Sequence, residues 1–210
     1  VLAAPVRAII DILPRLPEFI KKGCIVIDTG STKLEVMRIA SKLDMEFVGC
    51  HPLAGMEKKG PENAKGDIFN NSLCVLVPSK KASKEAVLLV GKLWRSLGAG
   101  IKILSATEHD RILAFVSHLP HAVIFSLIDS IRSSYFDFAA GGLKDTTRIG
   151  LSDPLLWRDV FLTNRKELIN AIKHFKWSLA RLESLVKNVQ PKELSAYLKK
   201  AKNKRNAFRP

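Results

Sequence analysis

The stretch CIVIDTGSTKLEVMRIASKLDMEFVGCH, residues 24–51, contains one complete strand–helix–strand pattern. Its β-branched, apolar runs at 24–27 and 46–49 predict two buried strands, and the apolar positions within 33–43 predict an amphipathic helix between them. Two strands joined by a helix are typical of parallel pairing, because the crossover returns the chain to the same edge of the sheet. This stretch therefore indicates an α/β fold.

The alternation of strands and helices continues along the first half of the chain. Residues 73–77 and 101–104 predict two more strands, and residues 84–97 predict the helix between them. The first five residues, Val1–Pro5, look like the end of a strand that is already under way. We therefore expect a doubly wound, parallel sheet with helices on its faces.

The second half of the chain is helical. Ser105 and Glu108 have the spacing of a capping box, and helical periodicity continues from them as far as residue 131. Because no strand pattern follows, we expect an α/β domain over 1–104 and an all-helical domain over 105–210 that ends in a basic tail. The many apolar positions of the helical part pack either against another subunit or in an intrachain core.

The composition is that of an ordinary globular protein. Of its 210 residues, 47% are hydrophobic and 26% are charged. No apolar run is expected to be long enough to cross a membrane, and the first residues lack the basic region of a signal peptide. Cys24, Cys50 and Cys74 contain no C-x-x-C pair and lie beside apolar runs, so we expect buried, reduced thiols in a cytoplasmic protein and no metal site.

The net charge is strongly positive. Lys and Arg outnumber Asp and Glu by 34 to 20, which gives +14 at pH 7. Much of the excess lies on helical segments and in residues 192–209, where solvated faces are the ordinary explanation. The charge favours anionic ligands in general. Nucleic-acid binding would rest on charge alone, because the sequence contains no nucleic-acid motif.

Two polar loops follow the first two complete strands. Ser31 lies in the loop at 28–33, and His51 follows the strand at 46–49, so both are expected at one edge of the sheet. A neutral imidazole, with its ordinary pKa of about 6.5, can accept a proton at physiological pH. The alternatives are a simple strand-to-helix turn for Ser31 and a histidine satisfied by backbone groups for His51.

A third polar segment, SHLPH at 117–121, lies within the long helical pattern. Pro120 removes an amide donor, so it should bend the helix and free the carbonyl of Val116. Asp110 and His121 are eleven residues apart, which is close to three full turns and predicts that they share a face. Such a face is either functional or simply solvated.

A fourth segment, GGLKDTTR at 141–148, combines two glycines with charged residues. Arg148 offers a planar guanidinium group suited to a carboxylate. The alternative is a structural pair between Asp145 and Arg148 on one helix. Trp157, on the helix that begins after Asp153, is expected in the core or in a pocket wall.

Taken together, these segments resemble the prephenate dehydrogenase family of tyrosine biosynthesis, which includes arogenate dehydrogenases. The resemblance covers most of the chain up to about residue 186. Six segments in the family's order carry it: VLAAPVR at 1–7, DTGSTK at 28–33, HPLAGMEKKG at 51–60, SHLPH at 117–121, GGLKDTTR at 141–148 and SDPLLWRD at 152–159.

The resemblance implies the C-terminal part of a Rossmann-type domain, followed by a helical domain that forms a homodimer. It implies oxidative decarboxylation of prephenate to 4-hydroxyphenylpyruvate with NAD or NADP. His51 is then the base that accepts the C4 hydroxyl proton, and Ser31 positions His51 and that hydroxyl. Arg148 would bind the ring carboxylate of the substrate, and His121 would lie near it.

The resemblance also assigns further residues around the substrate and the cofactor. It implies a charged network at the mouth of the pocket, two positions in the pocket lining and a turn beside the nicotinamide. These are Glu57, Lys144 and Asp145 for the network, Gly141 and Trp157 for the lining, and Ala4 and Pro5, with Ser31, for the cofactor.

The chain departs from the family pattern at two points. Met56 replaces a residue that is often a small hydroxyl residue in the family. The sequence also contains no G-x-G-x-x-G, the glycine turn that holds the pyrophosphate of a dinucleotide. We expect poor dinucleotide binding by this chain alone. The alternatives are an arogenate dehydrogenase and a non-catalytic, dimerising fragment.

Overall fold

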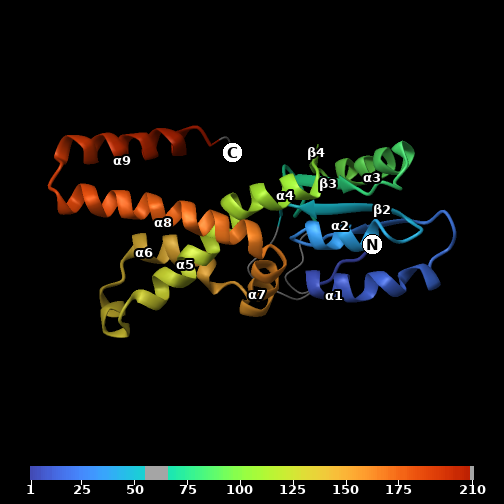
Figure 1. Ribbon diagram of the computed structural model, residues 1–210, viewed down its shortest axis with the longest axis horizontal. Coiled ribbons are helices and arrows are strands. Elements are labelled where there is room, and N and C mark those ends of the chain that lie inside the picture. The colour runs from blue at the N-terminus through green and yellow to red at the C-terminus, as the bar shows by residue number, and fades with distance from the viewer. Residues whose placement is uncertain (55–65, 209–210) are drawn as a thin grey trace. The chain divides into compact units, whose positions relative to one another are not determined.

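The computed structural model describes residues 1–54 and 66–208 (Figure 1). The chain divides into two compact units, Val1–Leu168 and Ile169–Pro210. The first unit contains the sheet and the helices that follow it. The second consists of most of helix α8 (Arg165–Lys187) together with α9 (Pro191–Asn206), and the hydroxyl groups of Ser178 and Tyr197 form a 2.9 Å hydrogen bond within it.

The sheet contains four strands in the order β1-β2-β3-β4. They are β1 (Ile25–Asp28), β2 (Glu46–Pro52), β3 (Leu73–Pro78) and β4 (Gly100–Ile103). Helix α2 (Leu34–Ala40) joins the parallel pair β1 and β2, and helix α3 (Lys84–Ser96) joins the parallel pair β3 and β4. Each predicted strand is present, and its bounds differ from the prediction by at most three residues.

One pairing differs from the prediction, because β2 and β3 are antiparallel. In the described part of the connection between them, residues 53–54 and 66–72, the chain forms bends and turns and no crossover helix. It therefore returns to β3 from the edge at which β2 ends. The predicted fold class, an α/β sheet followed by helices, is confirmed.

Apolar residues alternate along the strands and form two cores, one on each face of the sheet. Val26, Phe47 and Val75 belong to the core that contains α1 (Val6–Ile12) and α2. Ile27, Val48 and Leu76 belong to the core that contains α3. Figure 1 shows α1 and α2 on one side of the sheet and α3 on the other.

The first residues, which were predicted to be the end of a strand, form an isolated β-bridge beside β1. Leu2 forms a parallel bridge with Asp28, its N–H donates to the carbonyl of Ile27 at 2.7 Å, and its carbonyl accepts from the N–H of Thr29 at 3.1 Å. Ala4 and Pro5 therefore follow a strand-like segment and lie next to the start of α1. The cysteines are free, but only Cys50 and Cys74 are buried; the expectation of a buried Cys24 is wrong, because it precedes β1 and is exposed.

The helical part begins at the predicted capping box, in which Ser105 and Glu108 cap each other. Helix α4 (Ala106–Leu113) continues through a π-helical turn, η3 (Ala114–His118), into α5 (Leu119–Ser130). The irregular turn precedes Pro120, where a bend was predicted. The other elements are η1 (Leu13–Glu18), η4 (Ser133–Phe138), α6 (Gly141–Thr147), η5 (Arg148–Leu151) and α7 (Pro154–Thr163).

The helical stretch Ala106–Ser130 is long and apolar enough to cross a membrane by length and composition alone. The expectation that no apolar run reaches this length is therefore wrong. The stretch nevertheless carries three fully or almost fully buried polar side chains, those of His109, Asp110 and His118. Their partners are groups of the α/β part and of Asn164, so these buried side chains attach the stretch to the rest of the fold.

Candidate active site

A cleft of about 450 Å³ lies where the ends of β1 and β2 meet η3, α5 and the segment leading into α7. Ligands of open α/β sheets bind at the carboxyl ends of strands, and this cleft lies at such an edge. Its lining includes a hydroxyl group, three histidines and an indole. The residues that supply these groups are Ser31, His51, His118, His121 and Trp157.

His51 lies near the end of β2 and is partly open to the cleft. Its Nδ1 lies 2.8 Å from Nε2 of His109. Burial holds the pKa of His51 well below the ordinary value of a histidine, and the positive charge of Lys33 lowers it further. His51 is therefore neutral at physiological pH, which is the state in which an imidazole accepts a proton.

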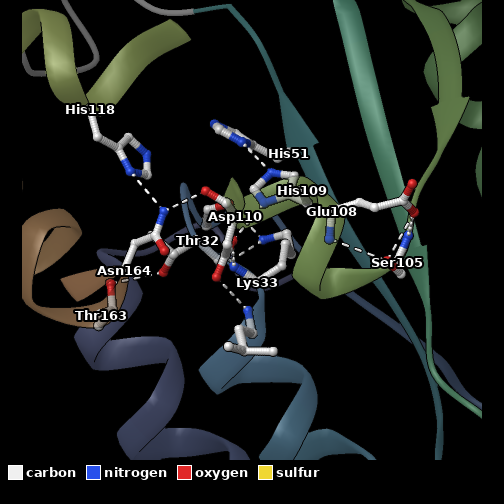
Figure 2. A network of polar contacts seen from close by, with 12 residues as sticks. Thr32, Lys33, His51, Ser105, Glu108, His109, Asp110, His118, Thr163 and Asn164 are labelled. Atoms are coloured by element: carbon white, nitrogen blue, oxygen red, sulfur yellow. Dashed lines mark hydrogen bonds and ion pairs between the residues drawn. The ribbon is translucent and has the colours of Figure 1, made fainter. Parts of the chain in front are cut away.

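His109 and Asp110 lie behind His51, away from solvent (Figure 2). Nδ1 of His109 lies 2.7 Å from Oδ1 of Asp110. The two carboxylate oxygens of Asp110 also accept hydrogen bonds from the backbone N–H groups of Lys33 and Leu34, each at 2.8 Å. The start of α2 thus receives a carboxylate from α4, which satisfies two of its unpaired amides.

A buried ion pair holds the loop after β1 in place. Nζ of Lys33 lies 2.7 Å from Oδ2 of Asp28, and both side chains are fully buried. Lys33 also donates to the carbonyl of Gly30 at 2.6 Å, while Asp28 accepts from the N–H groups of Gly30 at 2.9 Å and Cys50 at 3.1 Å. The pair therefore ties the loop that carries Ser31 to the strand that carries His51.

A second buried polar contact orients His118. The side-chain amide of Asn164 donates to the carbonyl of Asp110 at 2.7 Å, and the same nitrogen lies 3.0 Å from Nδ1 of His118. Because an amide nitrogen only donates, Nδ1 of His118 is an acceptor and its proton is on Nε2. Burial lowers the pKa of His118 to about 4, so the ring stays neutral.

His121 and Trp157 form one wall of the cleft. Their rings are stacked, with centroids 3.5 Å apart and an angle of 21° between the planes. Nδ1 of His121 lies 3.0 Å from the carbonyl oxygen of Ser117, to which it donates, so its proton is on Nδ1. Burial lowers the pKa of His121 as well. The wall is aromatic and uncharged near neutral pH.

Comparison with known proteins assigns the chain to a family. Residues 1–103 match the nucleotide-binding domain of prephenate dehydrogenase, and residues 105–200 match its dimerization domain. The chain belongs to the prephenate dehydrogenase family. The predicted resemblance is therefore confirmed over nearly the whole chain.

Individual relatives agree with this membership. The chain is 30% identical to the cyclohexadienyl dehydrogenase of Zymomonas mobilis, and the match covers 99% of the chain and 74% of that enzyme. It is 32% identical to the prephenate dehydrogenase of Bacillus subtilis, and this match covers 99% of the chain and 59% of that enzyme. A crystal structure of the A. aeolicus prephenate dehydrogenase with hydroxyphenyl propionate and NAD+ matches with a TM-score of 0.88 and 37% identity, covering 97% of the chain and 74% of that structure. The chain thus spans only part of each relative.

Several of the residues that the family resemblance selected lie together. Ser31, His51, His121 and Trp157 all line the cleft. The hydrogen-bond partner of His51 is His109, however, and not Ser31. Ala4 and Pro5 lie outside the lining, beside the strand-like residues that flank β1. Their assigned roles remain predictions.

The other selected residues lie apart from the lining. Gly141, Lys144 and Asp145 are exposed on α6, and Arg148 is exposed at the start of η5, one residue before Ile149, which does line the cleft. Glu57 and Met56 lie outside the described residues.

The expectation of a shared face for Asp110 and His121 is wrong. Asp110 faces the start of α2, whereas His121 faces the cleft. The π-helical turn between them explains the difference, because it takes more residues per turn than an α-helix and shifts the register of α5 relative to α4.

The sequence analysis missed several buried polar residues in and behind the cleft. Lys33 was interpreted only as the start of a helix, and His109, His118 and Asn164 were not selected. A usable signal was present for two of these residues, because Lys33 ends the loop at 28–33 that follows a predicted strand and His109 directly follows Glu108 of the capping box. Asn164 has no such signal, since its partner Asp110 is 54 residues away in the sequence.

Proposed function

We propose that this chain carries the catalytic centre of a prephenate dehydrogenase. The reaction is the oxidation and decarboxylation of prephenate to 4-hydroxyphenylpyruvate and CO2, with NAD or NADP as the oxidant. The observation that carries the proposal is a neutral His51 in the lining of a cleft, in a chain that belongs to this family. The chain spans 74% and 59% of the length of the two relatives named above, so the activity of the whole protein is a proposal.

His51 is the base in this proposal. Because Nδ1 is hydrogen-bonded to His109, Nε2 is the nitrogen that accepts the proton of the C4 hydroxyl group. Loss of that proton pushes electron density into the C4–O bond, and the hydride leaves C4 as the carbonyl forms. The bond between the ring and its carboxylate then breaks, CO2 departs and the ring becomes aromatic.

The remaining residues bind and orient the substrate. Ser31 holds the hydroxyl group near His51, and the stacked pair of His121 and Trp157 packs beside the ring. Arg148 binds the ring carboxylate. Because this carboxylate leaves as neutral CO2, its ion pair weakens during the reaction and contributes chiefly to substrate binding.

Part of the assigned set lies outside the cleft, on exposed positions of the dimerization domain. We propose that Gly141, Lys144 and Asp145 complete the substrate site when the chain forms a homodimer through its helical domain. Large exposed apolar side chains on the helical elements support such an association, among them Leu155 and Leu162, which are 61% and 63% exposed. Free thiols agree with a cytoplasmic location.

The residues present fit the nicotinamide end of the cofactor. Ser31 lies in the cleft that holds His51, and Ala4 and Pro5 follow the segment bridged to β1, so all three lie at one sheet edge. These residues would hold that end of the molecule. NAD or NADP, when bound, supplies the acceptor for the hydride.

The direct test is the formation of NADH or NADPH by the protein with prephenate, and separately with arogenate. We expect turnover with prephenate, with one 4-hydroxyphenylpyruvate formed for each NADH or NADPH. Turnover with arogenate alone would replace prephenate by the amino-acid substrate. No turnover with either substrate, in a protein that is folded and supplied with each cofactor in excess, would favour the non-catalytic, dimerising alternative.

A further inference from the structure

We infer that His109 and Asp110 are positioning residues that fix which nitrogen of His51 carries its proton. The three side chains form a continuous chain of contacts, with 2.8 Å between the two imidazoles and 2.7 Å between His109 and Asp110 (Figure 2). The inference rests on the proposed function of His51 and deepens it, since it explains how the base is held in its reactive form.

Asp110 decides which atom is the donor in each of these hydrogen bonds. Both carboxylate oxygens accept hydrogen bonds from backbone N–H groups, those of Lys33 and Leu34, and a backbone N–H can only donate. Asp110 is therefore held in its ionised, acceptor-only form at the start of α2. Nδ1 of His109 must then be the donor in the contact with Asp110.

The proton on Nδ1 of His109 decides the next contact. In a neutral His109, Nε2 carries a lone pair and accepts a hydrogen bond from Nδ1 of His51. A second proton on His109 would place a cation in a fully buried position, 2.8 Å from the group that must itself become positive. The neutral form is thus the one compatible with His51 as a base.

The consequence for His51 is a defined tautomer. With its proton on Nδ1, the lone pair is on Nε2, which is the nitrogen left for the substrate hydroxyl group. When His51 accepts the proton, the new positive charge is stabilised by its hydrogen bond to His109 and, through it, by Asp110. A base oriented by a buried carboxylate is the arrangement that hydrolases with a catalytic triad also use. Here the imidazole of His109 lies between the base, His51, and the carboxylate of Asp110.

The experiment is nitrogen NMR of the protein labelled with 15N-histidine, in which ring nitrogens with and without a proton have different shifts. The His51 signals are assigned by their loss in His51→Asn. We expect a protonated Nδ1 and an unprotonated Nε2 for His51 at neutral pH. A proton on Nε2 of His51 would overturn the inference, and this reading needs no catalytic activity.

Two substitutions of His109 extend the test to the reaction. His109→Gln keeps an oxygen that can accept from His51, whereas His109→Phe fills the space without an acceptor. We expect His109→Phe to lower kcat by about 100-fold with little change in KM, and His109→Gln to recover most of that loss. Equal kcat values for His109→Phe and the unchanged protein would contradict the inference.

The outcomes separate this inference from the proposed function. If the protein does not turn over prephenate but His51 still carries its proton on Nδ1, the positioning role of His109 and Asp110 stands and the proposed function fails. If turnover depends on His51 but its proton lies on Nε2, the activity and the need for His51 stand, whereas the positioning by His109 and Asp110 and the choice of Nε2 as the accepting nitrogen fail. Should His109→Phe not fold, the NMR reading of the unchanged protein still decides.

Discussion

The ammonium group of Lys33 lies 2.7 Å from the carboxylate of Asp28, and neither side chain is exposed to solvent. Such a pair is costly to bury but far more costly to break, because removing one partner leaves the other as an uncompensated charge. The pair also connects Gly30 with Cys50, and hence the loop of Ser31 with the strand of His51. Its integrity therefore bears on both the stability of the fold and the shape of the cleft.

Replacement of Lys33 should be strongly destabilising. We expect Lys33→Met to lower the free energy of unfolding by about 3–5 kcal/mol, because Asp28 would remain buried without its cation. Urea unfolding followed by circular dichroism measures this change. Lys81→Met is the matched control, since Lys81 pairs with Asp44 at 3.2 Å on the exposed surface and should change stability by less than about 1 kcal/mol. Equal effects of the two substitutions would refute the role of burial.

A side chain at Gly30 should disturb the same pair. A Cβ atom there would lie 2.9 Å from Oδ2 of Asp28 and 3.3 Å from Cδ1 of Ile9, so the carboxylate must move. We expect Gly30→Ala to lower the free energy of unfolding by about 1–3 kcal/mol. Gly142→Ala is the control, because a Cβ at Gly142 meets no atom within 4 Å and alanine favours the helix. Thermal unfolding of both variants would show whether only the first is destabilised.

Buried, neutral His118 should make the fold sensitive to acid. Its pKa is about 4 in the folded protein and about 6.5 in the unfolded chain, so the unfolded chain binds the extra proton between these values. The contribution of neutral His118 to the free energy of unfolding is complete above pH 6.5 and is lost as the pH falls towards 4. The free energy of unfolding should fall by roughly 3 kcal/mol over that range. Urea unfolding at a series of pH values measures this slope.

His118→Gln removes one titrating group and should reduce the slope of stability against pH over this range, leaving the contributions of His51 and His121, whose pKa values burial also lowers. His174→Asn, on an exposed position of α8, serves as the control and should leave the slope in place. A slope that is unchanged in His118→Gln would assign the acid sensitivity to other groups.

Arg148 should contribute to binding more than to turnover. We expect Arg148→Ala to raise the KM for prephenate by about tenfold or more, with a smaller change in kcat, because its ion pair with the ring carboxylate weakens as CO2 departs. Arg158→Ala is the control, since Arg158 pairs with Asp159 on the surface. Steady-state kinetics in which Arg148→Ala lowers kcat and leaves KM unchanged would reverse the proposed role.

Local sequence patterns predicted most of the fold and the part of the site that lies on strand ends. The strands follow from β-branched runs, and the helical half begins at the capping box of Ser105 and Glu108. Ser31 and His51 were expected together because each follows a strand, and both line the cleft. Patterns of this kind depend on neighbours within a few residues, which a sequence displays directly.

The features that were not predicted depend on contacts between distant segments. Asp110 accepts from the backbone of Lys33, 77 residues away, and His109 contacts His51, 58 residues away. The orientation of His118 follows from Asn164, 46 residues away. The antiparallel direction of β3 was not predicted, because the residues between β2 and β3 show no helix or strand periodicity from which a pairing direction follows. The periodicity of Ala106–Ser130 also gave no sign of the π-helical turn that separates Asp110 from His121.

The most direct test of the account compares the rate of NADH or NADPH formation from prephenate by the unchanged protein, by His51→Asn and by His174→Asn. We predict that His51→Asn lowers kcat by at least about 100-fold with a similar KM, because the substrate still binds but its hydroxyl proton has no acceptor. His174→Asn should keep the rate of the unchanged protein. A kcat for His51→Asn equal to that of the unchanged protein would contradict the assignment of His51 as the base.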